Sequence, residues 1–540
     1  MGVRFFILIG FFILLYTGVG ARLYRIQVER SDYYVERAEA RNELAEALAL
    51  RRGRIVVADR NGTTIPVAIN RDATIIYAVP REIKNEHETA AALAPLIGWE
   101  SDVLLRVLEK PKSLFRLLVD KAPADMVEAV REQALTGIYI GKKQYRLYPF
   151  GELAAPLMGF VGLNEINDTP IGLYGIEKRY QSTLAKGEQV SLTIDRAIQV
   201  EAERMLIKLM QDFSATGGTV IVEEPATGRI LGLANAPSFD PNAYGASPVQ
   251  NFINPAVQHV YEPGSVFKPL TMAAGIDAGL LTPETVFVDT GSVTMNGKTI
   301  TNWDGKAYGK ITMTNVIERS VNTGAVFAMG KIGHDRFLSY LKWFGFGETT
   351  GIDLPDEMRG SLVNLERRDA RPIDFATASF GQGTAVTPIQ LVNAFSGLAN
   401  GGVLMRPFVN SELGPEVVRR MVSKSAAAQA LSMMESAVEK AGVARIPGYR
   451  IAGKTGTAQV PNFEQGGYSD AFIHTFVGIA PFSSPRVVIL IKLDKPNVTL
   501  AGFTVVPAFK TFAQFVLNYY NIPPDKLASG ETATGTVREQ

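Results

Sequence analysis

The feature that most constrains this chain is an uncharged apolar stretch close to its start. Residues 5–21 read FFILIGFFILLYTGVGA, with arginines on either side at Arg4 and Arg22. As an α-helix the stretch would span about 25 Å, near the ~30 Å hydrocarbon thickness of a bilayer, and the arginines can reach the interfaces. We therefore predict one transmembrane helix over 4–22, with residues 1–3 as a cytoplasmic stub.

A cleaved signal peptide is the alternative, because Gly18, Gly20 and Ala21 are small. We favour the anchor, since the stretch runs directly into helix-like residues. The segment 23–48 is rich in Ala, Glu, Arg and Leu and has no Gly or Pro, which predicts a juxtamembrane helix. The arginines after the stretch do not fix the orientation, because large domains cross membranes largely regardless of nearby charge. We expect a single-pass protein of the cytoplasmic (inner) membrane with the bulk of the chain outside.

Composition excludes several classes of function. The 540 residues include 55 basic and 54 acidic side chains, so the net charge of +1 gives no reason to expect a nucleic-acid partner. There is no cysteine, which excludes disulfides, thiolate nucleophiles and Cys-based zinc sites. The four histidines lack metal-type spacing, so we expect no metal and no other cofactor. They are His87, His259, His334 and His474. For His259, core packing is the expected role, with the site entrance as the alternative.

The rest of the chain reads as two α+β domains. Residues 49–190 are predicted to form an elongated α+β pedestal, with a hairpin at Asn61-Gly62 and mainly helices over 86–135. Residues 191–521 contain β-rich runs at 217–234 and 473–493, with helical patterns near 265–280, 312–332 and 424–442. Strands at both ends with helices between them predict a mainly antiparallel sheet sandwiched by helices. The polar tail 522–540 is predicted to be disordered.

Three short motifs occur in order along the second domain. They are Ser265-Val266-Phe267-Lys268, Ser320-Val321-Asn322, and Lys454-Thr455-Gly456 followed by Thr457. A Ser-x-x-Lys match alone is weak evidence, because Ser339-Tyr340-Leu341-Lys342 fits equally well. We interpret that second copy as an exposed helical lysine beside a serine. Pro263-Gly264 marks a helix start ahead of Ser265, and the spacing of three then places Lys268 within reach of the Ser265 hydroxyl.

The residue types suit nucleophilic catalysis. A serine hydroxyl needs a neighbouring base, and a lysine can act as one if burial or a nearby positive charge lowers its pKa. Ser320 could relay a proton to a leaving amine, and Asn322 could hold Lys268 and a substrate amide. Lys454 would offer a fixed positive charge to a carboxylate, with Thr455 and Thr457 as hydrogen-bond donors. Gly456 would let an extended substrate lie close to the strand.

Together the motifs resemble the active site of penicillin-recognising serine enzymes. Further segments resemble class B penicillin-binding proteins along nearly the whole chain. They are RGRIVVADRNG (52–62), YGIEKRYQSTL (174–184), SLTIDRAIQ (191–199), ATGRILGLANAPSFDPN (226–242) and ASFGQGTAVTPIQL (378–391). Val321 stands where β-lactamases carry aspartate, which agrees with many penicillin-binding proteins.

This resemblance implies a dimerisation-type pedestal followed by a transpeptidase domain that cross-links peptidoglycan stem peptides and releases D-alanine. Ser265 would be the acyl-ester nucleophile and Lys268 its base, with Ser320 and Asn322 as the second catalytic element. Lys454, Thr455 and Thr457 would bind the carboxylate of a stem peptide or β-lactam, beside Gly456. The backbone N–H groups of Ser265 and Thr457 would form the oxyanion hole.

The resemblance also implies partners, namely a membrane glycosyltransferase and other division or elongation proteins. The run HTFVGIAPFSSPRVVILIKLDKP (474–496) and the short pedestal favour the septal type over the elongation type. Three alternatives stay open. They are an elongation-type transpeptidase, a β-lactamase, sensor or D,D-carboxypeptidase of the same superfamily, and a non-catalytic scaffold of the wall-synthesis machinery.

Overall fold

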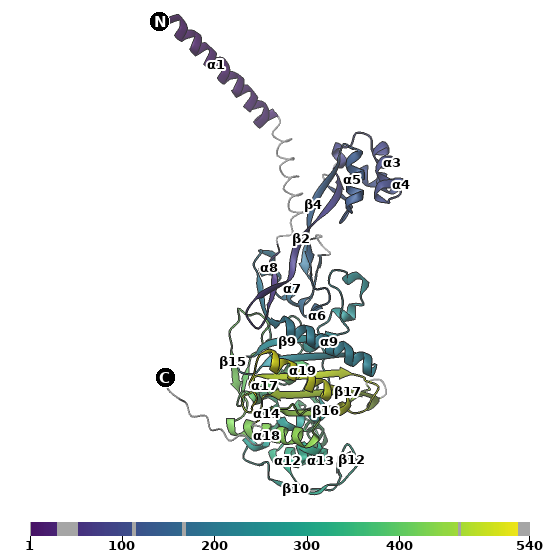
Figure 1. Ribbon diagram of the computed structural model, residues 1–540, viewed down its shortest axis with the longest axis vertical. Coiled ribbons are helices and arrows are strands. Elements are labelled where there is room, and N and C mark those ends of the chain that lie inside the picture. The colour runs from purple at the N-terminus through teal and green to yellow at the C-terminus, as the bar shows by residue number, and fades with distance from the viewer. Residues whose placement is uncertain (1, 30–51, 111–114, 165–168, 463–465, 527–540) are drawn as a thin grey trace. The chain divides into compact units, whose positions relative to one another are not determined.

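A computed structural model describes residues 2–29, 52–110, 115–164, 169–462 and 466–526 (Figure 1). The chain divides into two compact units. One unit comprises Met1–Arg52 and Ile69–Leu147, and the other comprises Gly53–Ala68 and Tyr148–Gln540. The long strand β2 (Thr64–Ala78) contributes its first residues to the second unit and the remainder to the first.

The uncharged stretch near the start lies in helix α1 (Gly2–Tyr24), which continues into a short π-helix (Arg25–Glu29). Over the described parts of the chain, no helix is both long enough and apolar enough to cross a membrane. α1 confirms the predicted helix, and the membrane span over 4–22 stays a prediction. Most of the juxtamembrane helix predicted over 23–48 falls outside the described residues.

The first unit packs three helices against a small antiparallel sheet. β2 pairs with β4 from Ile69–Leu147 to Ala78–Ile138, and also with β3. The core lies between these strands and the helices, with Leu93 fully buried. The elements are a 3-10 turn (Pro80–Glu82), α3 (Glu86–Ile97), α4 (Ser101–Leu108), β3 (Arg116–Val119), α5 (Ala124–Glu132) and β4 (Ile138–Leu147). The prediction of mainly helices over 86–135 is confirmed apart from β3.

The second unit begins with the predicted hairpin. β1 (Ile55–Ala58) pairs antiparallel with β2, and the Asp59 carboxylate accepts backbone N–H groups of Asn61 and Thr63, each at 2.9 Å, which closes the turn. On its other side β1 pairs parallel with β7 (Val190–Asp195). The intervening elements are α6 (Ala155–Met158), β5 (Val161–Leu163), β6 (Pro170–Gly172), α7 (Gly175–Arg179) and α8 (Gln181–Ala185).

The centre of the second unit is a five-stranded sheet in the order β16-β17-β18-β8-β9. Every neighbouring pair is antiparallel, so the predicted antiparallel sheet is confirmed. β16 lies at one edge, where one side of its backbone faces away from the sheet. The strands are β8 (Gly217–Glu224), β9 (Arg229–Ala236), β16 (Ala452–Pro461), β17 (Tyr468–Ala480) and β18 (Val487–Asp494).

Helices cover both faces of this sheet, and Figure 1 labels α9, α17 and α19 in the region of its strands. Along β18, Val488 and Leu490 join one buried cluster while Ile489 and Ile491 join the other. Because successive strand residues point to opposite faces, a strand buried on both faces reads as a continuous apolar run. The covering helices are α9 (Arg196–Phe213) and α19 (Val505–Tyr519) on one face, with α11 (Lys268–Asp277), α17 (Pro388–Ala399) and α18 (Lys424–Ala441) on the other.

The remaining elements lie mostly between β9 and β16. They are 3-10 turns (Tyr244–Ala246, Val249–Phe252, η5 Gly264–Phe267 and η6 Ala501–Phe503), α10 (Pro255–Gln258), β10 (Val286–Asp289), β11 (Ser292–Met295), β12 (Lys298–Thr301), β13 (Gly309–Thr312), α12 (Met313–Arg319), α13 (Asn322–Ile332), α14 (His334–Trp343), α15 (Val363–Glu366), α16 (Pro372–Ala378), β14 (Val403–Met405) and β15 (Val417–Arg420). Helices predicted near 265–280 and 424–442 are confirmed, whereas the one predicted over 312–332 is broken in two at Ser320-Val321.

The start of the predicted disordered tail is ordered. The Tyr449 hydroxyl donates to the Ile522 carbonyl at 2.6 Å, and the Asp525 carboxylate accepts the Arg450 N–H at 2.7 Å. Ile522 also packs into the core. Apolar and hydrogen-bonding partners far away in sequence hold residues 522–526, so composition alone gave the wrong boundary there. The rest of the tail lies outside the described residues.

Candidate active site

The first motif forms a tight turn that leads into α11. Residues 264–267 make a 3-10 turn, and the α-helix begins at Lys268, so the predicted helix start is confirmed with a tighter first turn. Gly264 has φ of 61°, a conformation that favours glycine. Residues three apart are eclipsed in a 3-10 turn. This brings the Lys268 Nζ to 3.0 Å from the Ser265 Oγ.

The second motif occupies the break between α12 and α13. Ser320 ends α12 in the left-handed conformation with φ of 57°, which turns its oxygen atoms toward the first motif. Lys268 Nζ donates to the Ser320 Oγ at 3.1 Å and to the Ser320 carbonyl at 2.5 Å. The expectation that Asn322 holds Lys268 is wrong for this structure. The Asn322 Nδ2 instead donates to the Thr301 carbonyl at 2.8 Å.

The third motif lies on the edge strand β16. Lys454 Nζ donates to the Ser320 Oγ at 3.1 Å and to the Thr455 carbonyl at 3.2 Å. The Thr457 Oγ1 accepts the Ala501 N–H at 3.3 Å. The structure therefore brings the nucleophile candidate and both lysines together around Ser320, with the two threonines on the same strand as Lys454.

Gly456 is needed for a reason that the sequence did not reveal. A Cβ atom at this position would lie 2.6 Å from the Pro263 carbonyl oxygen and 3.3 Å from the Val266 Cβ. Real Cβ atoms do not come that close to backbone oxygen. The glycine thus allows β16 to pack directly against η5. The role of Gly456 in admitting an extended substrate stays a prediction beside this packing role.

Burial sets the charge state of both lysines. Lys268 is fully buried, and this burial together with the nearby positive Lys454 holds the pKa of Lys268 well below its usual range. Burial also lowers the pKa of Lys454 to about 7. The lowered pKa of Lys268 favours the neutral amine next to the Ser265 hydroxyl, which is the form that a general base requires. The role predicted for Lys454, a positive charge that holds a carboxylate, stays a prediction.

Comparison with known proteins identifies the family. Residues 218–514, more than half of the chain, match the penicillin-binding protein transpeptidase domain. Residues 48–197 match the penicillin-binding protein dimerisation domain. The chain is a class B penicillin-binding protein. The predicted resemblance is confirmed, and the protein is a serine-type transpeptidase by family.

Two curated relatives extend over most of this penicillin-binding protein. Stage V sporulation protein D of Bacillus subtilis (strain 168) is 30% identical over 525 residues, covering 88% of this chain and 79% of the relative. Peptidoglycan D,D-transpeptidase FtsI of Escherichia coli (strain K12) is 28% identical over 566 residues, covering 98% and 94%. The crystal structure of penicillin-binding protein 2X from Streptococcus thermophilus superposes with a TM-score of 0.70 at 20% identity, covering 88% of this chain and 81% of that chain, which shows the shared fold.

Sequence reasoning missed one acidic residue of the penicillin-binding protein's site. The Glu262 carboxylate accepts the Gly383 N–H at 2.8 Å and the Tyr468 hydroxyl at 2.9 Å, and burial raises its pKa. Gly383 belongs to the loop expected near the cleft, and the Gly381 carbonyl of that loop accepts the Gly264 N–H at 2.9 Å. Glu262 therefore ties three separate segments together. Its position three residues before Ser265 could have marked Glu262 as a site residue. Its hydrogen-bond partners could not be predicted, because they lie more than 100 residues away in the sequence.

The second Ser-x-x-Lys copy is structural, as predicted. Ser339 Oγ donates to the Asp335 carbonyl one turn back in α14 at 2.9 Å. Lys342 is exposed and pairs with Glu366 at 2.8 Å. Neither side chain contacts the three motifs.

The histidines show no metal site. No cluster of three metal-ligating side chains occurs in the part of the chain that the structure describes. His259 is exposed, so the expectation of core packing is wrong. His474 is fully buried beside Thr457 across the β16–β17 pair, with its Nδ1 2.9 Å from the Thr504 Oγ1. Burial lowers the pKa of His474 to about 4, so its ring is neutral at physiological pH.

Proposed function

We propose that this penicillin-binding protein cross-links peptidoglycan through an acyl-enzyme on Ser265. The observation that carries the proposal is the buried Lys268 amine 3.0 Å from the Ser265 Oγ, with its pKa lowered by burial and by Lys454. A neutral amine at that distance can take the hydroxyl proton as the oxygen attacks.

The acylation step forms one bond and breaks another. Ser265 Oγ attacks the carbonyl of the penultimate D-alanine of a stem peptide, and Lys268 takes the hydroxyl proton. The amide C–N bond then breaks, and terminal D-alanine leaves as an amine that receives a proton through Ser320, which accepts hydrogen bonds from both lysines. Backbone N–H groups of Ser265 and Thr457 would stabilise the oxyanion, and each such donor contributes about 3 kcal/mol in comparable enzymes.

Deacylation reverses the roles. An amine from a neighbouring stem peptide attacks the ester carbonyl and forms the new amide bond, and its proton passes to Lys268. The ester C–O bond breaks, and Lys268 returns the proton to the departing Ser265 Oγ. Lys454, Thr455 and Thr457 would hold the terminal carboxylate of the donor peptide. The same contacts would hold the carboxylate of a β-lactam, which then acylates Ser265. With its Nδ2 donating to the Thr301 carbonyl, Asn322 would contact a substrate amide through its Oδ1. Exchange of one amide for another needs no ATP or metal ion.

Labelling with fluorescent penicillin tests the proposal. We expect the full-length protein to be labelled on Ser265, with the site located by peptide mass spectrometry, and S265A to be unlabelled. Persistent labelling of S265A would overturn the assignment. The lifetime of the acyl-enzyme distinguishes the enzyme classes: a β-lactamase hydrolyses the adduct rapidly, and absence of any adduct would favour a scaffold. A D,D-carboxypeptidase would release D-alanine without forming cross-links.

We also propose a septal role and an extracytoplasmic site of action. The run 474–496 and the short pedestal support the septal role. The uncharged stretch 5–21 and the substrate class support attachment at the cytoplasmic membrane with the domain boundaries predicted above. A membrane glycosyltransferase and further division proteins would be the partners.

A fluorescent fusion should concentrate at mid-cell, and a side-wall distribution would favour the elongation type. Protease added to intact spheroplasts should digest the second unit.

A further inference from the structure

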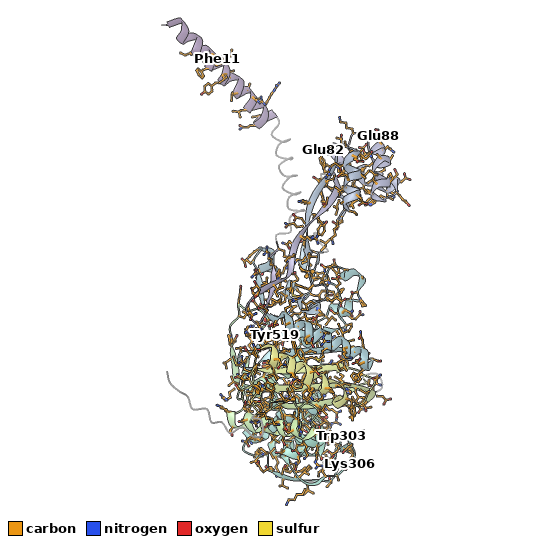
Figure 2. The ribbon with its side chains drawn as sticks, in the orientation of Figure 1. Phe11, Glu82, Glu88, Trp303, Lys306 and Tyr519 are labelled. Atoms are coloured by element: carbon orange, nitrogen blue, oxygen red, sulfur yellow. The ribbon has the colours of Figure 1, made fainter. Side chains whose placement is uncertain are left out.

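Three consecutive residues at the end of β12 contact the chain on both sides of Ser320. The Thr301 carbonyl accepts the Asn322 Nδ2 at 2.8 Å. The Asn302 Oδ1 accepts the Asn322 backbone N–H at 3.0 Å, and the Trp303 Nε1 donates to the Arg319 carbonyl at 3.1 Å. Figure 2 labels Trp303 in the region where Figure 1 places β12 and α13.

These contacts satisfy backbone groups that the helix break leaves unpaired. The last carbonyls of α12 and the first N–H groups of α13 have no partner within their own helices. Val321, at the N-cap of α13, has no side chain that can accept a hydrogen bond. Asn302 supplies the missing acceptor from a different element, and it also accepts the Thr323 N–H at 3.3 Å. Trp303 supplies a donor to the end of α12.

Asp289 fixes the orientation of the Asn302 amide. Asp289 and Asn302 are each 2% exposed. The Asp289 carboxylate can only accept, and it accepts the Asn302 Nδ2 at 2.9 Å, so the Asn302 Oδ1 must face α13. The same carboxylate accepts the Thr323 Oγ1 at 2.6 Å and the Tyr308 N–H at 2.9 Å. A buried, fully hydrogen-bonded amide of this kind has one stable arrangement.

We infer that Asn302 is a positioning residue for the transpeptidase reaction, because it holds Ser320-Val321-Asn322 where Ser320 meets both lysines. The inference rests on the proposed acylation of Ser265. Without Asn302, the N-terminus of α13 loses its acceptor, and the left-handed Ser320 is free to relax away from Lys268. The carboxylate-binding strand β16 does not contact Asn302. Loss of Asn302 should therefore slow the chemical step and leave initial ligand binding largely unchanged.

The test compares N302A with the matched control N254A in the full-length, detergent-solubilised protein. Asn254 is also a buried asparagine whose Oδ1 accepts a helix N-terminal N–H, here from Ala256 at 3.2 Å, but it does not contact the three motifs. Time courses with fluorescent penicillin give the first-order acylation constant and the half-saturating concentration. We expect N302A to lower the acylation constant at least tenfold with less than twofold change in half-saturation, and N254A to change neither comparably.

Two further measurements separate the positioning role of Asn302 from a general folding defect and from the proposed reaction. W303F removes the indole N–H and shortens a ring system that is 59% exposed, and it should lower the same constant by two- to fivefold. Hydrogen exchange of peptides covering residues 320–324 should be at least tenfold faster in N302A than in wild type. Wild-type rates and wild-type exchange in both variants would overturn the inference. A wild-type protein that takes up no penicillin would instead overturn the proposed function, and exchange alone would then decide the role of Asn302.

Discussion

Lys268 and Lys454 share one acceptor: each Nζ atom lies 3.1 Å from the hydroxyl oxygen of Ser320. Both lysines are buried, at 0% and 4% exposure. Two ammonium groups at one buried oxygen disfavour each other's charged form, so the pair holds its protons less tightly than two separate lysines. Ser320 therefore connects the base candidate to a second titrating group.

The first prediction concerns this coupling. K454M removes the positive charge that helps to keep the pKa of Lys268 low, so the pKa of Lys268 should rise. The acid limb of the acylation rate should then move to higher pH, because less neutral amine is present at a given pH. The pH dependence of penicillin acylation measures this shift. A pH profile whose acid limb stays at the same pH, with only a lower maximal acylation rate, would contradict the coupling.

A second prediction concerns a buried carboxyl far from the motifs. Glu223 on β8 is fully buried, neither of its oxygens has a hydrogen-bond partner among the described residues, and burial raises its pKa to about 8. The folded protein thus holds a proton that the unfolded chain releases above its ordinary pKa of 4.5. Stability should therefore fall as pH rises from about 5 to 8.

E223M should remove most of this pH dependence and stabilise the protein by a few kcal/mol at pH 8, with a much smaller gain at pH 5. Thermal unfolding at the two pH values measures the difference. E284M replaces an exposed glutamate and is the matched control, with no pH-dependent gain expected. An equal gain for E223M at both pH values would show that packing, not the proton, sets its effect.

A third prediction follows from the contact between β16 and η5. G456A places a methyl group 2.6 Å from the Pro263 carbonyl, so η5 must move. We expect a loss of about 1–3 kcal/mol in stability and a large fall in acylation rate. G330A is the control, because a Cβ there meets nothing within 4 Å on the exposed side of α13. It should stabilise the helix by about 0.5–1 kcal/mol. A wild-type acylation rate in G456A would show that η5 can move without disturbing Ser265.

The fourth prediction concerns the second Ser-x-x-Lys copy. S339A and K342A should each leave penicillin labelling within twofold of wild type, since neither residue contacts the motifs. The Lys342–Glu366 pair is about half exposed on both sides, so its loss should cost no more than about 0.5–1 kcal/mol. Labelling gels and thermal unfolding check both values. Loss of labelling in S339A would reopen the choice of nucleophile.

Local patterns predicted much of the fold. Alternation and turn residues gave the hairpins at 55–69, 217–234 and 473–493, and the Pro263-Gly264 signal placed the helix start. The helix break at Ser320 was not predicted, because helical spacing continues through it and the cause lies in Asn302, Trp303 and two lysines from other segments. The contacts of Asn322, Gly456 and Glu262 were not predicted for the same reason: their partners come from distant parts of the chain.

The left-handed backbone at Ser320 restricts which substitutions this position tolerates. That conformation costs most L-residues roughly 1–2 kcal/mol and excludes β-branched side chains in practice, while glycine, asparagine and aspartate accept it. Because serine already adopts this conformation, a β-branched residue at position 320 should cost stability in addition to any effect on the reaction. The backbone conformation limits which residue types position 320 can accept, and the reaction limits them further.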